Sequence, residues 1–150
     1  MIRSTGALCF AAVLWASPAA AGSVSDTLRE FGLFGTWAVD CDAPPSPDDN
    51  HAVFSEVPPA GAQELIYFSP QYKPNTYAIN SAERVGSTTD QISLGVTFGD
   101  DMHQELILLV RNDTIRTMWN IAGDGSVRVK DGTITSNGGV THSLTRCRTD

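Results

Sequence analysis

The sequence predicts an all-β protein: a single antiparallel barrel of about eight to nine strands, or a two-sheet sandwich, with a short N-terminal helix. Three observations predict this class. Short segments that alternate apolar and polar residues are separated by turn residues about every eight to twelve positions. Helical periodicity is confined to one segment near the start of the chain. Cys41 and Cys147 lie at the ends of the first and last predicted strands, where they could tie the two edges of a barrel together.

The chain begins with a segment that has the pattern of a secretory signal peptide. Residues 1–21 read MIRSTGALCFAAVLWASPAAA, with Arg3 as the positive start, an apolar core over residues 7–16 and a run of alanines at the end. The apolar core is about half of the ~20 residues that a membrane-spanning helix needs. We therefore expect cleavage after Ala21, a single mature domain of residues 22–150, and a periplasmic or secreted protein.

Export changes the cysteine count and the charge of the chain. Removal of the leader leaves Cys41 and Cys147, and in an oxidising compartment an isolated pair is most simply a disulfide. A redox-active pair is the alternative, but the C-x-x-C spacing is absent. The formal net charge is −7, and loss of Arg3 makes the mature chain one unit more negative. Such a chain is repelled by nucleic acid and by anionic membrane surfaces, so neither is an expected partner, and no membrane insertion is expected after cleavage.

The remaining elements follow in order. A short helix is expected within residues 22–34, where Ser25 can cap it and Leu28 and Phe31 lie near one face. A proline-rich run over residues 42–50 then ends the first strand, because proline cannot donate to a β-ladder. The predicted strands cover residues 36–41, 52–57, 65–69, 76–83, 92–98, 104–111, 114–121 and 141–148, with two further short strands before the last.

The hairpin at residues 106–121, LILLVRNDTIRTMWNI, is the candidate ligand-binding element. Its first strand is apolar on both faces, and its second is predicted to present alternate residues from Ile115 to Ile121 on one face. Placed in the middle of a barrel, these residues would point toward the strands that carry two tyrosines, whose apolar body and polar handle suit an amphipathic molecule. An ordinary packed core is the alternative. The candidate ligand-binding residues are Tyr67, Tyr77, Ile115 and Trp119.

The sequence carries no motif for catalysis or metal binding. The histidines of the mature chain, His51, His103 and His142, each lie in a different segment, without H-x-x-x-H or H-E-x-x-H spacing. There is no G-x-S-x-G motif, and a bridged cysteine pair leaves no reactive thiol. The sequence therefore predicts a protein that is not an enzyme, with no catalytic residue, metal or cofactor.

Residues 25–41 resemble the start of the lipocalin and wider calycin pattern, in which a short helix precedes a G-x-W motif on the first strand of an eight-stranded meander. Here the motif is Gly35-Thr36-Trp37. The resemblance implies that Gly35 and Trp37 are structural, that Trp37 plugs the closed end of the barrel, and that Arg146 or Arg148 packs over it by a cation–π contact. The F-G-x-W-x-V-x-C stretch is also similar to the opening of exported bacterial proteins related to invasion-associated locus B. Neither resemblance implies catalytic residues.

Two classes of function remain open at this point. The first is a small exported barrel that carries or senses an apolar or amphipathic small molecule. The second is an acidic protein-binding module, such as an inhibitor of a basic envelope-lytic enzyme, that uses loops such as residues 42–50. A purely structural role in the envelope is a third. Barrels of about eight strands either fill with their own side chains or hold one small ligand, so strand number alone does not choose between these functions.

Overall fold

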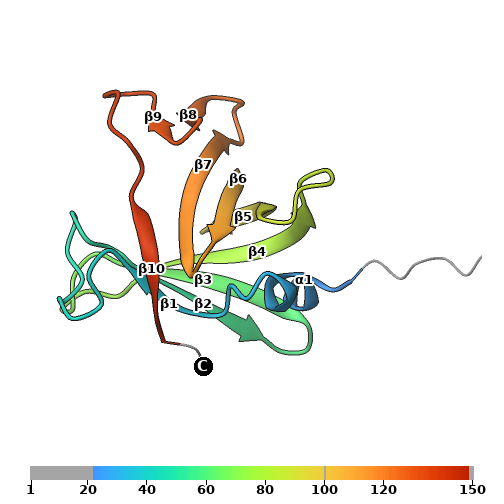
Figure 1. The fold of residues 1–150 in the computed structure, drawn as a ribbon, viewed down its shortest axis with the longest axis horizontal. Helices are drawn as coiled ribbons and strands as arrows, with labels where there is room; N and C mark the ends of the chain where they lie inside the picture. The colour runs from blue at the N-terminus through green and yellow to red at the C-terminus, as the bar shows by residue number, and fades with distance from the viewer. Residues whose placement is uncertain (1–21, 100, 149–150) are drawn as a thin grey trace, which may run out of the picture.

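The computed structural model describes residues 22–99 and 101–148. The predicted signal peptide, residues 1–21, lies outside the described residues, so its cleavage stays a prediction. The described chain is mostly β-strand with one short helix (Figure 1). Within these two ranges, no helix is long and apolar enough to cross a membrane.

Ten strands follow the helix α1 (Val24–Glu30) along the chain. They are β1 (Gly35–Ala38), β2 (His51–Val57), β3 (Gly61–Tyr67), β4 (Asn75–Arg84), β5 (Gln91–Phe98), β6 (Met102–Arg111), β7 (Thr114–Ala122), β8 (Val127–Lys130), β9 (Thr133–Ile134) and β10 (Ser143–Arg148).

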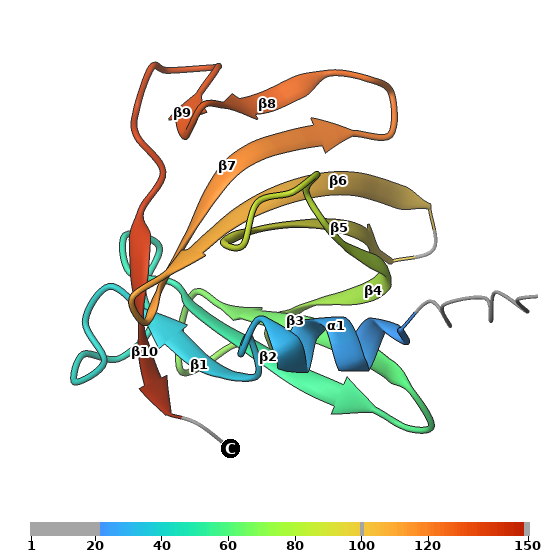
Figure 2. The ribbon, with the colours of Figure 1, turned by 45° about the vertical axis from the view of Figure 1, so that its right-hand side comes forward.

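The strands form a closed antiparallel barrel, which confirms the predicted barrel over the sandwich. Each strand from β1 to β7 pairs with the next along the chain, and β10 pairs with β1 on one side and β7 on the other. Eight strands, β1 to β7 and β10, therefore complete the ring. The first part of β7 pairs with β10, whereas its last part pairs with β8, so β8 and β9 extend from the barrel as a short flap (Figure 2).

The helix α1 is capped by Ser23 and not, as the sequence analysis expected, by Ser25. The Ser23 hydroxyl accepts a hydrogen bond from the Asp26 backbone N–H at 3.1 Å, and the Asp26 carboxylate accepts one from the Ser23 backbone N–H in return. This capping box satisfies N–H groups that the helix cannot. Ser25 is instead a residue of the helix itself, and its side chain is buried. Leu28 has no exposed surface and belongs to the barrel core.

Trp37 fills one end of the barrel. Its side chain is fully buried, and its indole Nε1–H donates to the carbonyl of Leu33 at 2.8 Å. The guanidinium carbon of Arg146 lies 4.3 Å from the centre of the indole ring, which confirms the expected contact from the last strand for this arginine. Arg146 also donates to the carbonyl oxygens of Gly32 and Phe34, so the chain between α1 and β1 is held against β10.

The barrel interior is occupied by a continuous cluster of apolar side chains. Strands on opposite sides of the ring contribute alternate residues to it, as expected where one face of each strand is buried. The buried members are Leu28, Leu33, Trp37, Ala52, Phe54, Ala62, Ile79, Ile92, Leu94, Val96, Leu106, Leu108 and Ile115.

The predicted disulfide is present. Cys41 and Cys147 are bridged across a sequence separation of 106 residues, with their Cα atoms 5.3 Å apart. Cys41 follows β1 and Cys147 belongs to β10, so the bridge ties together the two strands whose pairing helps to close the ring. Chain entropy alone would allow such a link up to about 4.7 kcal/mol of stabilisation.

Replacement of Trp37 by alanine should lower the free energy of unfolding by about 3–5 kcal/mol, because it opens a large cavity in a fully buried site. Denaturant unfolding followed by circular dichroism measures this loss. Trp119→Ala is the matched control, since Trp119 is only partly buried on the outer face of β7 and its loss should be smaller. Equal stability of the Trp37→Ala and parent proteins would contradict the role of Trp37 as the barrel plug.

Candidate functional site: the pocket beneath the N-terminal helix

The predicted ligand-binding residues do not share one face of the barrel wall. Ile115 points inward and is 4% exposed, whereas Trp119 pairs with Ile107 on the outer face. The cause is a bulge in β7: Thr117 pairs with Leu108, and the next pair is Trp119 with Ile107, so one extra residue lies between them. A bulge of this kind shifts every following side chain to the other face.

The two tyrosines are separated in the same way. Tyr77 points inward and packs against Phe98 with ring centres 5.0 Å apart. Tyr67 pairs with His51 and is an odd-numbered residue of β3, a strand whose even-numbered Ala62 is buried, so Tyr67 faces outward. The predicted common face is therefore wrong for Tyr67 and Trp119. Ligand contact by any of the four residues stays a prediction.

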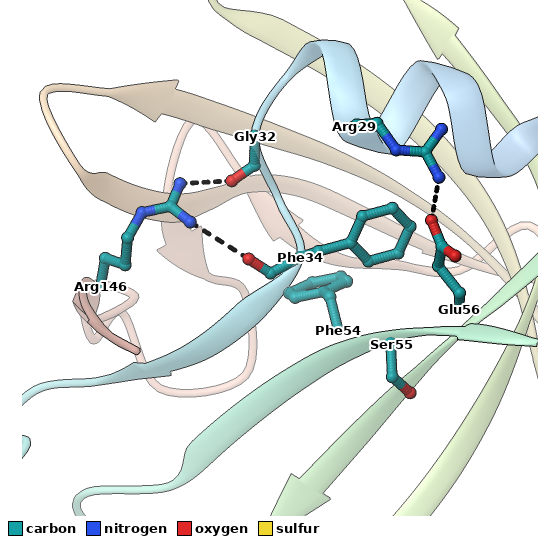
Figure 3. Close-up of a pocket in the computed structure, with 7 residues that line it drawn as sticks. All are labelled: Arg29, Gly32, Phe34, Phe54, Ser55, Glu56 and Arg146. Atoms are coloured by element: carbon teal, nitrogen blue, oxygen red, sulfur yellow. Dashed lines mark hydrogen bonds and ion pairs between the residues drawn. The ribbon is translucent and has the colours of Figure 1, made fainter. Parts of the chain in front are cut away.

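The structure offers a different pocket, of about 570 Å³, between α1, the start of β1, and β2 (Figure 3). Its apolar part consists of the rings of Phe34 and Phe54. The ion pair between Arg29 and Glu56 lies on one side of these rings, and Arg146 lies on the other (Figure 3). The volume falls within the range of about 300–1,000 Å³ that is common for small-molecule sites.

Arg29 and Glu56 are positioned by contacts between α1 and β2. Arg29, in the last turn of α1, donates to Asp26 at 3.0 Å and pairs with Glu56. The Ser25 hydroxyl donates to the same Glu56 carboxylate at 3.1 Å. Because more than half of each side chain in the Arg29–Glu56 pair is exposed, the pair adds little stability. Its consequence is geometric: one cation and one anion are held at the rim of an apolar pocket.

Arg146 has a structural role on the opposite side of the pocket. Its guanidinium donates to two backbone carbonyls, to the Asp113 carboxylate at 3.2 Å, and lies over Trp37. Arg146 also lines the pocket, but each of its guanidinium nitrogens already donates to a partner and its side chain is only 17% exposed, so Arg29 is the cation that a ligand can reach. A molecule with an apolar body and an acidic head group matches this arrangement.

Sequence reasoning missed this pocket because its parts are far apart in the chain. Phe34 lies next to the G-x-W motif, so its position could have drawn attention to it. The pairing of Arg29 with Glu56, 27 residues away, has no local signal. Phe54 reads as an ordinary inward residue of β2, and it is indeed buried.

A carboxyl group also lies inside the barrel. Glu64 on β3 is 9% exposed and lies opposite Phe54 on one neighbouring strand and Tyr77 on the other. Burial raises the pKa of Glu64 to about 7. Burial also raises the pKa of Tyr77, and the nearby charge of Glu64 adds to that shift.

The described residues contain no group of three or more histidine, cysteine, aspartate or glutamate side chains that could hold a metal ion. Comparisons with protein-family models, with curated proteins and with solved structures gave no match. Conclusions about function therefore depend on the geometry of the molecule itself.

Replacement of Glu64 by glutamine should change how stability depends on pH. Because the pKa of Glu64 is raised from 4.5 to about 7 on folding, the folded state binds the proton more tightly, and ionisation of Glu64 destabilises it as the pH rises from 4.5 through 7. Above pH 7 the full effect is about 3 kcal/mol. Glu64→Gln should remove this decline and be the more stable protein at pH 8, while the two proteins differ little at pH 4.

Chemical unfolding at a series of pH values measures the difference. Glu105→Gln, on the exposed outer face of β6, is the control and should keep the decline of the parent protein. A Glu64→Gln profile parallel to that of the parent would show that Glu64 is already ionised at low pH, as an exposed carboxylate is.

Proposed function

We propose that this chain is an exported, calycin-like binding protein that holds an amphipathic small molecule with an acidic head group, and that it has no catalytic role. The observation that carries the proposal is the pocket beneath α1, in which an apolar wall lies beside the Arg29 guanidinium, a group exposed enough to meet an acidic head group. The contact of Arg146 with Trp37 supports the calycin likeness. The small β-barrel itself is shown by the structure.

The physical basis is the division of the pocket into an apolar part and a charged rim. Apolar ligand surface buried against Phe34, which lies next to the buried ring of Phe54, contributes about 25 cal/mol per Å², before the cost of ordering the ligand is subtracted. An acidic head group can accept hydrogen bonds from the Arg29 guanidinium, which is exposed enough to exchange its present partners for the ligand. The middle of the barrel is packed with side chains, so the site lies at its helix-covered end.

Export is a separate part of the proposal, supported by the leader-like residues 1–21 and by the disulfide. When the full chain is expressed in a bacterium with a secretory pathway, the protein recovered from outside the cytoplasm should have the mass of residues 22–150 less two hydrogens. Intact-mass spectrometry measures this. Recovery of the uncleaved chain, or detection of free thiols without reduction, would contradict it.

Replacement of Arg29 by glutamine should weaken binding of dodecanoate, used as the acidic amphipathic probe, by about tenfold, since it removes the charged partner of the head group. Binding of dodecanol, which lacks the charge, should change little. Isothermal titration calorimetry measures both. The matched control is Arg84→Gln, because Arg84 also contacts α1 through Glu30 and Phe31 but does not line the pocket. Equal effects of the two substitutions, or no binding of dodecanoate to the parent protein, would contradict the proposed site.

The acidic protein-binding alternative is supported by a different feature, the loop at residues 39–50. The Asp49 carboxylate accepts hydrogen bonds from the backbone N–H groups of Val39 at 2.8 Å and Asp40 at 3.0 Å, which orders the loop. The loop presents exposed Asp42 and Asp48. Inhibition of a basic lysozyme by the purified protein, lost on replacement of Asp42 and Asp48 by asparagine, would favour this function over small-molecule binding.

A further inference from the structure

A second groove lies on the outer face of the barrel, across β4 to β7, with a volume of about 390 Å³. Gly95 lies at its floor, where a Cβ atom would lie 2.5 Å from the Ser81 hydroxyl, so the absence of a side chain makes room for Ser81, which accepts a hydrogen bond from the Gly95 N–H at 3.2 Å. Around this floor are polar side chains from two strands, β4 and β6, and one apolar residue from a third, β7. They are Asn80, His103, Glu105 and Ile121.

A chain of hydrogen bonds fixes the polar side chains of this groove. The Asn80 side-chain amide donates to the Thr97 hydroxyl at 2.6 Å, and that hydroxyl lies 2.9 Å from Nδ1 of His103. The Thr97 hydroxyl has one proton and two lone pairs, so while it accepts from Asn80 it can either donate to Nδ1 or accept from it. In the tautomer that the proposal below requires, Thr97 donates to Nδ1 and neutral His103 carries its proton on Nε2, the nitrogen that is not bonded to Thr97.

A bulge in β4 places Asn80 in this chain. Ile79 pairs with Val96 and Ser81 pairs with Gly95, so Asn80 is an extra residue without a partner of its own in the ladder. Bulges of this kind redirect a side chain and are common beside functional sites. Here the result is that Asn80 can reach Thr97 on the neighbouring strand, next to the floor at Gly95.

The groove therefore presents an alternating set of hydrogen-bonding groups. The carbonyl oxygen of Asn80 is an acceptor, Nε2–H of His103 is a donor, and the carboxylate of Glu105 is an acceptor. A cation, which only donates, would leave the His103 donor without a partner, and an anion, which only accepts, would meet the Glu105 carboxylate. Hydroxyl groups both donate and accept, so neighbouring hydroxyls satisfy the whole set.

We propose that the outer-face groove centred on Gly95 and the Asn80–Thr97–His103 chain binds a polyhydroxylated ligand of sugar type. This site is separate from the pocket beneath α1, and its occupation does not depend on that pocket. Trp119 pairs with Ile107 on the outer face of the barrel, next to the pair of Ile121 with Glu105 on the same face. Trp37, by contrast, is buried in the end of the barrel. Trp119 is therefore a natural fluorescence reporter for the groove.

The test uses maltotriose and chitotriose as sugar probes and triglycine as a peptide control, each titrated into the isotopically labelled mature protein. At least one sugar should shift the backbone amide resonances of Gly95, His103 and Gly123 and change the emission of Trp119, whereas triglycine should not. If neither sugar shifts these resonances, or if triglycine alone shifts them, the proposal is overturned.

Two variants test the role of the hydrogen-bond chain. Thr97→Val keeps the shape of the side chain but removes both bonds, so it should weaken sugar binding by about tenfold and leave dodecanoate binding unchanged. The nitrogen resonances of His103 should show the Nε2–H form in the parent protein and a mixture of tautomers in the variant. Asn80→Ala should weaken sugar binding in the same direction.

The matched control is Thr76→Val, the same change at an exposed position of β4 that does not line the groove. It should leave sugar binding and the His103 resonances as in the parent protein. Equal binding by the Thr97→Val and parent proteins, or equal losses in Thr97→Val and Thr76→Val, would overturn the proposal.

Discussion

The guanidinium group of Arg146 is the contact on which the closed end of this barrel depends. It joins the carbonyls of Gly32 and Phe34, the carboxylate of Asp113 in the turn between β6 and β7, and the face of Trp37. These partners come from the segment after the helix, from the turn before the neighbouring strand β7, and from the first strand. Arginine suits the position because it offers five donors in one plane and a flat face for the indole, which a lysine ammonium cannot provide.

The disulfide and this arginine act on the same short stretch of β10. Arg146 pairs with Trp37 and lies over its ring, and the next residue, Cys147, is an extra residue in the β1–β10 pairing that is bonded to Cys41. The covalent link and the cation–π contact therefore hold two consecutive residues of β10. Together they explain why the first and last strands can close the ring although their pairing is irregular.

The barrel could be predicted from the sequence because its signals are local: alternation along each strand, turn residues between strands, and one cysteine beside each edge. The residues of the candidate site could not. Met118 is an extra residue in β7, and it places Trp119 and Ile121 on the opposite face from the one predicted. The partner strand β6 is apolar on both faces, so its sequence does not indicate where the bulge lies. The predicted cap of α1, Ser25, also differs from the observed cap, Ser23. Both residues are serines and cap a helix equally well, so only the burial of Ser25 in the folded protein distinguishes them.

The two proposed binding sites of this barrel lie where regular strand pairing fails. In the middle of the ring, alternate side chains from eight strands meet and fill the space, and the one buried carboxyl there, Glu64, lowers stability when it ionises. At the helix-covered end, the carbonyl oxygens of Gly32 and Phe34 accept hydrogen bonds from Arg146, and β1 begins after these residues. The pocket lies beside Phe34, in this segment without regular strand pairing. On the outer wall, the groove lies beside the bulge at Asn80. In this eight-stranded ring the inward side chains fill the interior, so both proposed sites lie at irregular positions of the wall and not at its centre.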